Sequence, residues 1–304
     1  MSIPLTLGLW VLTTYTTHIL SIVTGNDSWV DRAWSIAPAI YVASLTRWDD
    51  PRSVVVAAAV TLWAARLTFN FWRKDGYNPR SEDHRWAYIR SILPGPLYTA
   101  FHLVFISIFQ NLLLLLIALP AAPPPLPPRA SGPQPWCMAD TAILIVFSIL
   151  LALETLADEQ QWAYHQLKQA TTTTTTTTTT TCSPEHRRHI ALGFCTTGVY
   201  RYSRHMNFFA EMGIWWCVYA WGVVARPHHH HHWLNPTLVG PLLLTLLFQG
   251  STAFTESISA KKYPAYKIYQ QTTSRLIPLW PGPPLNININ MNLPAPPPPP
   301  RKQQ

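Results

Sequence analysis

Long apolar runs dominate the pattern of hydrophobic and polar positions. They cover residues 3–24, 33–46, 53–72, 97–120, 137–157, 209–226 and 237–256. Several of them reach the roughly 20 residues that a helix needs to cross the hydrocarbon core of a bilayer. The pattern therefore predicts an all-α fold, a polytopic transmembrane helical bundle with six or seven spans.

Polar residues recur at helical spacing near an end of four of these runs. The four sets are Arg66, Asn70 and Arg73 after Trp63; Glu154, Asp158, Gln161 and His165; Arg204, Asn207 and Glu211; and Gln249, Thr252 and Glu256. At 3.6 residues per turn, each set shares one helix face.

The free energy of burying charge in lipid separates two interpretations of these stripes. A charged side chain at mid-bilayer costs on the order of 3 kcal/mol, and such residues usually face a bundle interior or a wet cavity. Four stripes together favour one polar cavity that opens toward one membrane face. The alternative is that the residues lie at interfacial depth, extend to the headgroups and pair with each other.

Composition agrees with a membrane protein. Of the 304 residues, 48% are hydrophobic and only 12% are charged, whereas about 25% would be charged in a typical soluble domain. No Lys or Arg precedes the first run and no small-residue cleavage pattern follows it, so we expect a retained helix and not a signal peptide. The net charge of +8 lies mostly at the ends of apolar runs, which suits membrane lipids as partners and not nucleic acid.

Low-complexity tracts interrupt the apolar pattern. They are the Pro-rich stretch 120–135, the Thr tract 171–181, the His tract 228–232 and the Pro/Asn-rich end 282–304. Proline cannot continue a helix, so 120–135 is predicted to be a loop. We expect one membrane-embedded domain over 1–281 with the other tracts as loops, followed by a disordered tail over 282–304.

The cysteines and the His tract indicate no metal site. Cys137, Cys182, Cys195 and Cys217 match no zinc or redox spacing and are interpreted as isolated thiols. Consecutive histidines cannot all point at one ion, so 228–232 is interpreted as a solvated loop.

Arginines in and beside the stripes suggest the ligand. The guanidinium groups of Arg66, Arg73, Arg201 and Arg204 suit phosphate, and the Asn and carboxylate groups suit ribose hydroxyls and carboxamides. The mixture fits a phosphorylated nucleotide cofactor. No GxGxxG or GxxxxGK[ST] sequence is present, which excludes a Rossmann or P-loop cradle.

One segment resembles a known signature. "RYSRHMNFFAE" at 201–211 resembles the "SRHPNYFGE" motif of the membrane steroid 5-alpha-reductase-like superfamily, in its DUF1295-type branch. Further landmarks follow in the family's order over roughly 27–281: "DRAWS" (31–35), "RLTFNFWR" (66–73), "SEDHRWAYIR" (81–90), "LADEQ" (156–160) and "ESISAKKYPAYKIYQQTTSRLIPLWP" (256–281).

The resemblance implies a helical membrane bundle, commonly of seven spans, in the endoplasmic reticulum. NADPH would occupy a cytosolic cavity, and a lipid-like enone would enter from the membrane. Matching positions assign cofactor contacts to Asp158, Arg204, Asn207, Glu211, Tyr263, Tyr266 and Arg275. To these we add Arg66, Asn70, Arg73, Gln161, Arg201 and His205 as predicted cofactor-binding residues.

The chain departs from the motif at three positions. Met206 replaces Pro, Phe208 replaces Tyr and Ala210 replaces Gly. The change at Phe208 removes a hydroxyl donor near the nicotinamide.

Reduction of a conjugated C=C bond needs hydride at the β carbon and a donor that stabilises the enolate oxygen. "SEDHRWAY" offers Glu82, Asp83, His84 and Tyr88, of which Glu82 and Tyr88 are the predicted catalytic residues. The alternative is a cytosolic loop whose charges pair with Arg90 or with 187–189.

Three functions stay open. The first is an NADPH-dependent reductase of a lipid or steroid-like enone. The second is an S-adenosylmethionine-dependent membrane methyltransferase of the isoprenylcysteine carboxyl type, which shares a similar motif. The third is a non-catalytic membrane protein that keeps the fold.

Overall fold

A computed structural model describes residues 3–124, 135–173, 190–226, 233–283 and 285. Most of the predicted Pro-rich loop, most of the Thr tract, the His tract and nearly all of the predicted tail lie outside these described residues. Every regular element in the described ranges is a helix, which confirms the all-α prediction.

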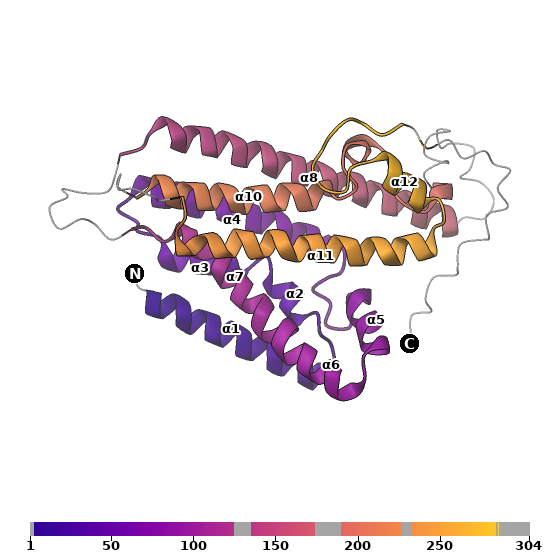
Figure 1. The fold of residues 1–304 in the computed structure, drawn as a ribbon. Helices are drawn as coiled ribbons and strands as arrows, with labels where there is room; N and C mark the ends of the chain where they lie inside the picture. Colours follow the sequence, from indigo (N-terminus) through magenta and orange to yellow (C-terminus); the bar gives the residue numbers. More distant parts are fainter. Residues whose placement is uncertain (1–2, 125–134, 174–189, 227–232, 284, 286–304) are drawn as a thin grey trace. The chain divides into compact units, whose positions relative to one another are not determined.

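The helices follow the chain in two groups separated by the Pro-rich stretch (Figure 1). The first group is α1 (Ile3–Thr24), α2 (Trp29–Ala33), α3 (Ala37–Leu45), α4 (Pro51–Arg73), α5 (His84–Ile92), α6 (Gly95–Phe101), the π-helix η1 (His102–Phe109), α7 (Gln110–Ala118) and the 3₁₀ turn η2 (Leu119–Ala121). The second group is α8 (Met138–Thr173), η4 (Gly198–Arg201), α10 (Met206–Val224), η5 (Pro236–Leu238), α11 (Val239–Lys262) and α12 (Tyr266–Thr272).

Five described helical segments are long and apolar enough to cross a membrane, so the prediction of six or seven was wrong. They are Ile3–Thr24, Pro51–Arg73, Gly95–Ala121, Met138–Ala170 and Pro236–Lys262. The run 33–46 fails because α3 has only 9 residues, and about 20 are needed. The run 209–226 lies largely in α10, which is not among the five spans because Asn207, Glu211 and its Trp and Tyr side chains lower its mean hydropathy.

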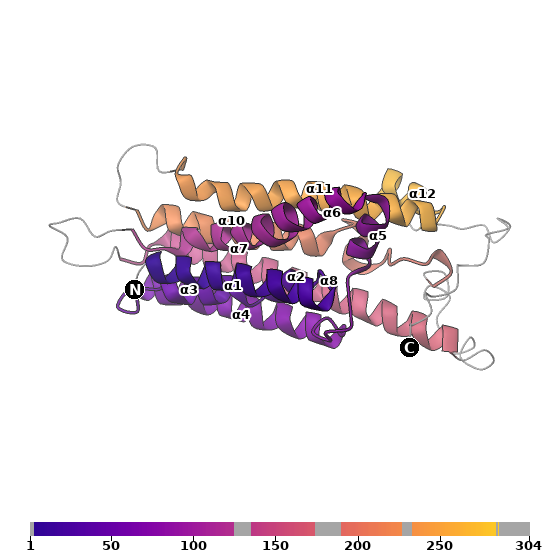
Figure 2. The same ribbon diagram turned by 90° about the horizontal axis from the view of Figure 1, so that it is seen from below.

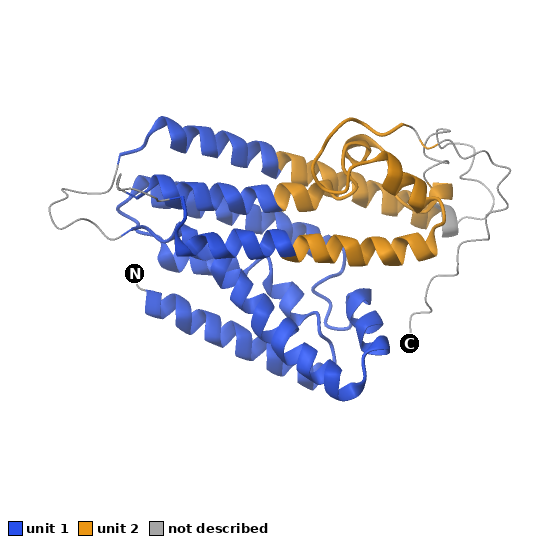
Figure 3. Ribbon diagram, viewed as in Figure 1, with its two compact units in different colours: residues 1–151, 212–246 blue, residues 152–211, 247–304 orange. Residues whose placement is uncertain are grey.

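The described chain forms two compact units (Figure 3). Unit 1 comprises residues 1–151 and 212–246, and unit 2 comprises 152–211 and 247–304. The division therefore falls within α8, α10 and α11.

Helix α8 is longer than a bilayer requires. Its 36 residues correspond to about 54 Å at 1.5 Å per residue, whereas the hydrocarbon core is about 30 Å thick. A tilt within the usual 0–40° range does not absorb the excess. Because the residues from Glu154 onward are the polar half of α8, this half extends beyond the hydrocarbon.

Unit 1 is held by α3, which packs against α1, α4 and α7 (Figure 2). Aromatic pairs extend this core: Trp63 of α4 meets Trp215 of α10 edge to face at 4.9 Å between ring centroids. Phe147 of α8 lies 5.6 Å from Trp221 of α10. Offset and edge-on geometry favours such pairs beyond their buried area.

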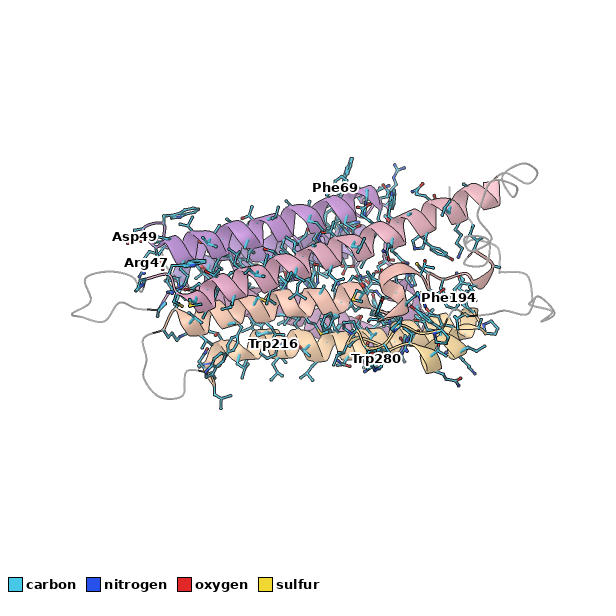
Figure 4. The ribbon with its side chains drawn as sticks, turned by 90° about the horizontal axis from the view of Figure 1, so that it is seen from above. Arg47, Asp49, Phe69, Phe194, Trp216 and Trp280 are labelled. Atoms are coloured by element: carbon cyan, nitrogen blue, oxygen red, sulfur yellow. The ribbon has the colours of Figure 1, made fainter. Side chains whose placement is uncertain are left out.

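A buried ion pair joins the first turns of α4 and α8. Nε and Nη2 of Arg52 donate to the two carboxylate oxygens of Asp140, each over 2.7 Å. The two side chains are 5% and 0% exposed. Asp50 caps α4 by accepting from the Arg52 backbone N–H over 3.1 Å, and Arg47 and Asp49 lie at the same end, 3.5 Å apart (Figure 4).

Close helix contact in unit 1 depends on glycine. A Cβ built at Gly222 would lie 2.3 Å from the carbonyl oxygen of Pro120, and one at Gly240 would lie 2.2 Å from that of Leu116. Both obstacles are backbone atoms, which cannot move aside as a flexible side chain can. Gly8 in α1, by contrast, has nothing within 4 Å of its Cβ position.

We therefore expect Gly222→Ala to lower the unfolding temperature of the detergent-purified protein. Gly8→Ala is the matched control, and it should leave stability unchanged or raise it by up to about 1 kcal/mol, because alanine is the better helix former. Equal behaviour of the two variants in thermal unfolding would contradict this packing.

Candidate functional site

The segment that precedes α10 is paired with the segment that follows α12. The backbone N–H of Arg204 donates to the carbonyl of Ser274 over 2.9 Å, and that of His205 donates to Arg275 over 3.1 Å. Gly282 donates to the carbonyl of Arg201 over 2.7 Å. Residues 201–205 and 274–282, far apart in sequence, thus form one junction in unit 2, which we call the α10 junction.

Glu256 on α11 is the centre of this junction. Its carboxylate accepts from Nε and Nη2 of Arg204 over 2.7 and 3.0 Å. It also accepts from Nε2 of Gln270 over 2.9 Å, and Nε2 of His205 lies 3.0 Å away. Side-chain exposure is 7% for Arg204 and 6% for Glu256, so this bidentate pair is buried and satisfied on both sides.

Arg204 is engaged through every nitrogen of its guanidinium group. Besides the two bonds to Glu256, its Nη1 donates to the carbonyls of Gln270, over 2.9 Å, and Thr273. The side chain therefore fixes the end of α12 to α11. A phosphate bound directly to Arg204 would have to displace one of these acceptors.

Aromatic residues pack around the junction. Tyr269 donates its hydroxyl to the Tyr200 carbonyl over 2.5 Å, and Tyr200 donates to the carbonyl of Ala157 over 3.2 Å. Phe194 packs edge-on to Tyr266 at 4.9 Å. Burial, followed by the Glu256 charge, raises the pKa of Tyr266, so this phenol stays protonated at neutral pH.

Other predicted cofactor residues of unit 2 differ in how accessible they are. Arg201 is exposed and makes a long, 3.4 Å bond to the Gly282 carbonyl. Asn207 is half-buried in the first turn of α10, whereas Asp158 and Glu211 are buried. Arg275 donates to Gln249 Oε1 over 2.5 Å.

Two further predicted positions of unit 2 have defined partners. Gln161 lies one turn before His165 on α8, with 3.2 Å between their side-chain nitrogens. The Tyr263 hydroxyl lies 3.2 Å from Nζ of Lys168. Burial alone would raise the pKa of Tyr263, but Lys168 and Lys262 outweigh burial and lower it.

The predicted residues on α4 belong to unit 1. Arg73 donates through Nε to Oδ1 of Asn70 over 3.1 Å, and its guanidinium lies 5.5 Å from the ring centroid of Phe69. Asn70 is buried, and Arg66 is half-buried one turn earlier. The spacing thus does place this polar stripe on one helix face.

The predicted catalytic residues Glu82 and Tyr88 also belong to unit 1. Glu82 accepts from Arg90 over 2.7 Å and from the backbone N–H of Asp27 over 2.9 Å. This contact agrees with the alternative interpretation of the segment, in which it is a loop whose charges pair with Arg90. Tyr88 is half-buried on α5.

Sequence reasoning missed a polar cluster around Asp27, in the turn after α1. The Asp27 carboxylate accepts from Arg90 over 2.5 Å, from Ser21 over 2.8 Å and from Tyr98. His102 Nε2 lies 3.2 Å away. Burial would raise the pKa of Asp27, but the bonds from His102, Tyr98, Arg90 and Ser21 outweigh it and hold the pKa well below its usual range.

Hydrogen bonds continue this cluster along the inner face of α1. Ser21 Oγ lies 2.8 Å from His102 Nε2, and His18 Nδ1 lies 2.8 Å from Ser107 Oγ. His102 and Ser107 lie on the π-helix η1, a geometry that is rare and often found at functional sites. The signal in the sequence was the recurrence of Thr, His and Ser along "TTYTTHILS", which departs from an all-apolar span.

Free thiols and a small hollow also occur among the described residues. Cys137, Cys195 and Cys217 are free, as expected, and Cys182 lies outside the described part. A hollow of about 20 Å³ beside Asp50, Arg52 and Trp221 is lined by none of the predicted site residues. That volume suits about one water molecule.

Comparison with known proteins identifies the family of the chain. The family model described as "Protein of unknown function (DUF1295)" matches residues 17–273. An uncharacterized protein of Schizosaccharomyces pombe, C594.04c, is 37% identical over 271 residues, which cover 85% of this chain and 74% of the relative. No solved structure matches the chain.

Glu256 gives a direct test of the junction. Glu256→Gln leaves the buried guanidinium of Arg204 without its counter-charge and should destabilise the protein by about 3–5 kcal/mol. The loss should be read in urea unfolding followed by Trp fluorescence. Lys267→Ala, at an exposed site on α12, should change stability by less than about 0.5 kcal/mol. A Glu256→Gln variant as stable as the wild type would refute the buried pair.

Asp27 predicts a specific pH dependence. A carboxyl with a depressed folded-state pKa contributes stability above its unfolded-state pKa, near 3.8, and that contribution is lost as pH falls below this value. The difference in unfolding temperature between wild type and Asp27→Asn should therefore be largest near neutral pH and should shrink below about pH 4. Asp49→Asn, at a side chain 71% exposed, should show little difference at any pH. A difference in unfolding temperature between wild type and Asp27→Asn that does not change with pH would contradict the lowered pKa of Asp27.

Proposed function

The chain belongs to the DUF1295 family, the steroid 5-alpha-reductase-like branch of membrane proteins, and from this premise we propose that it is an integral membrane oxidoreductase. In this proposal it reduces a conjugated C=C bond of a lipid or steroid-like substrate with NADPH. The endoplasmic reticulum membrane is part of the proposal.

The α10 junction is the observation that carries the proposal. It places Arg201 and His205 before α10, a 19-residue helix whose first turn carries Asn207. Backbone N–H groups and the helix dipole at this end of α10 favour an anion. Arg201 is exposed and Asn207 half-buried, so both can reach a ligand while the Arg204–Glu256 pair stays intact. A guanidinium suits the cofactor phosphates, and an amide suits ribose or carboxamide groups.

In this proposal the roles of the motif residues divide. Arg204 acts as a positioning residue, because its donors hold Glu256 and the carbonyls of Gln270 and Thr273. Arg201 and Asn207 act as ligand-binding residues. Asp158 and Glu211 are buried on α8 and α10 and stay predicted cofactor-binding residues.

NADPH, when bound, supplies the hydride that adds to the β carbon of the enone. The protein must then stabilise the enolate oxygen and provide a proton. Glu82 accepts hydrogen bonds from Arg90 and from the Asp27 backbone within unit 1. Tyr88, the other predicted catalytic residue, carries a phenol hydroxyl that can donate.

Phe208 favours a second candidate, a non-catalytic member that keeps the fold. Its ring stacks on His205 at 5.7 Å and on Phe248 at 4.6 Å between centroids. The family motif has tyrosine here, so the hydroxyl donor is replaced by an apolar stack. A methyltransferase that uses S-adenosylmethionine is the remaining alternative.

Ligand titration separates these candidates. We expect saturable binding of NADPH to the detergent-purified full chain, weakened about tenfold or more by Arg201→Ala and by Asn207→Ala, because a hydrogen bond to a charged group contributes about 1.5–3 kcal/mol. Arg226→Ala, beyond the other end of α10 where Arg226 bonds the Gly222 carbonyl over 2.6 Å, is the matched control and should bind normally.

Two results would contradict the reductase, and a third would contradict the location of its site. Binding of S-adenosylmethionine in place of NADPH would favour the methyltransferase. Binding of neither ligand by a folded protein would favour the non-catalytic candidate. NADPH affinity unchanged in Arg201→Ala and Asn207→Ala would remove the α10 junction as the site.

A further inference from the structure

The segment between Arg275 and Gly282 presents apolar side chains to the outside. Ile277 is 64%, Leu279 62% and Trp280 89% exposed. Tyr202, on the segment paired with it, is 43% exposed. We call these four residues the apolar patch. Large apolar side chains exposed together indicate an interaction surface.

The patch is held in place by its backbone. Arg275 accepts from the His205 N–H over 3.1 Å, and Gly282 donates to the Arg201 carbonyl over 2.7 Å. Gly282 packs so closely that a Cβ there would lie 2.3 Å from Oγ1 of Thr273. Pro278 and Pro281 restrict the chain between these anchors. The apolar side chains are therefore presented outward by a fixed segment.

Contacts with α11 indicate the depth of the patch. Arg275, just before the patch, donates to Gln249 over 2.5 Å. Gln249 follows the largely apolar stretch Val239–Phe248 of the candidate span Pro236–Lys262. Phe208, in the first turn of α10, stacks on Phe248 at 4.6 Å. The patch thus adjoins the half of α11 in which polar side chains recur, and such side chains favour the headgroup region over the hydrocarbon.

We propose that the apolar patch is an interfacial anchor that inserts into the headgroup and acyl boundary of the bilayer. Trp and Tyr are enriched at this boundary because the apolar ring contacts the acyl chains while the N–H or O–H group contacts water and headgroups. The anchor holds the α10 junction at the membrane surface. It does not depend on the proposed reductase activity.

Photolabelling tests the occupant of the patch. The full chain is reconstituted in phosphatidylcholine liposomes and labelled with a lipid-soluble aryl diazirine or, separately, with a water-soluble diazirine, and labelled residues are identified by mass spectrometry. Residues 276–281 should be labelled several-fold more from the lipid phase. Stronger labelling from water would overturn the anchor, and so would protection from both probes, which would indicate a covering protein surface.

Substitution gives a second, independent measurement. Leu279→Ser combined with Trp280→Ser should leave the unfolding temperature in detergent unchanged, since both side chains are exposed. In liposomes, lipid-phase labelling of Tyr202 should fall several-fold. Ile268→Ser, 44% exposed on α12, is the matched control and should keep the labelling of Tyr202. Wild-type labelling of Tyr202 in the double variant would overturn the proposal.

Discussion

A buried charge in a membrane protein must find its partner within the chain, because hydrocarbon offers none. The Arg204–Glu256 pair meets this constraint with a bidentate bond between side chains 7% and 6% exposed. Arg52 and Asp140 meet it in unit 1 at 5% and 0% exposure. Removing one partner of such a pair destabilises a protein far more than replacing both partners with apolar side chains of similar volume. The pairs therefore fix which helix ends come together.

The same constraint explains why Arg204, in a motif whose residue types suit a ligand, binds other parts of the protein instead. Arg204 donates to a carboxylate on α11 and to two carbonyls at the end of α12. This leaves Arg201 and Asn207 as the accessible groups of the motif. In the proposed function the paired groups shape the site and the accessible groups bind the cofactor. With this division of roles, the buried charges of the α10 junction are paired and stabilise it, while its accessible groups are available to a ligand.

Periodicity in the sequence was sufficient for the fold class and for the helix faces. The stripe Arg66, Asn70 and Arg73 lies on one face of α4, and Gln249 and Glu256 lie on α11, as predicted. The number of spans was predicted wrongly for two runs. In 33–46 the apolar composition continues across a helix break, and in α10 Trp and Tyr make up much of the run. The predicted run 137–157 was too short, because α8 continues to Thr173.

Pairing partners could not be predicted in the same way. Glu256 and Arg204 are 52 residues apart, and nothing in helical spacing says which stripes meet. The Asp27 cluster joins α1, α5, α6 and η1 through single polar residues, none of which forms a stripe with the others. Helical spacing finds faces within one element, whereas these contacts depend on the tertiary packing of several.

The most direct test of the central claim, that the α10 junction is the cofactor site, is hydrogen–deuterium exchange of the full chain in nanodiscs with and without NADPH. The account predicts added protection in residues 198–208 and 266–282, with little change in α1–α3. Saturable NADPH binding that protects other segments and leaves both of these unchanged would contradict it.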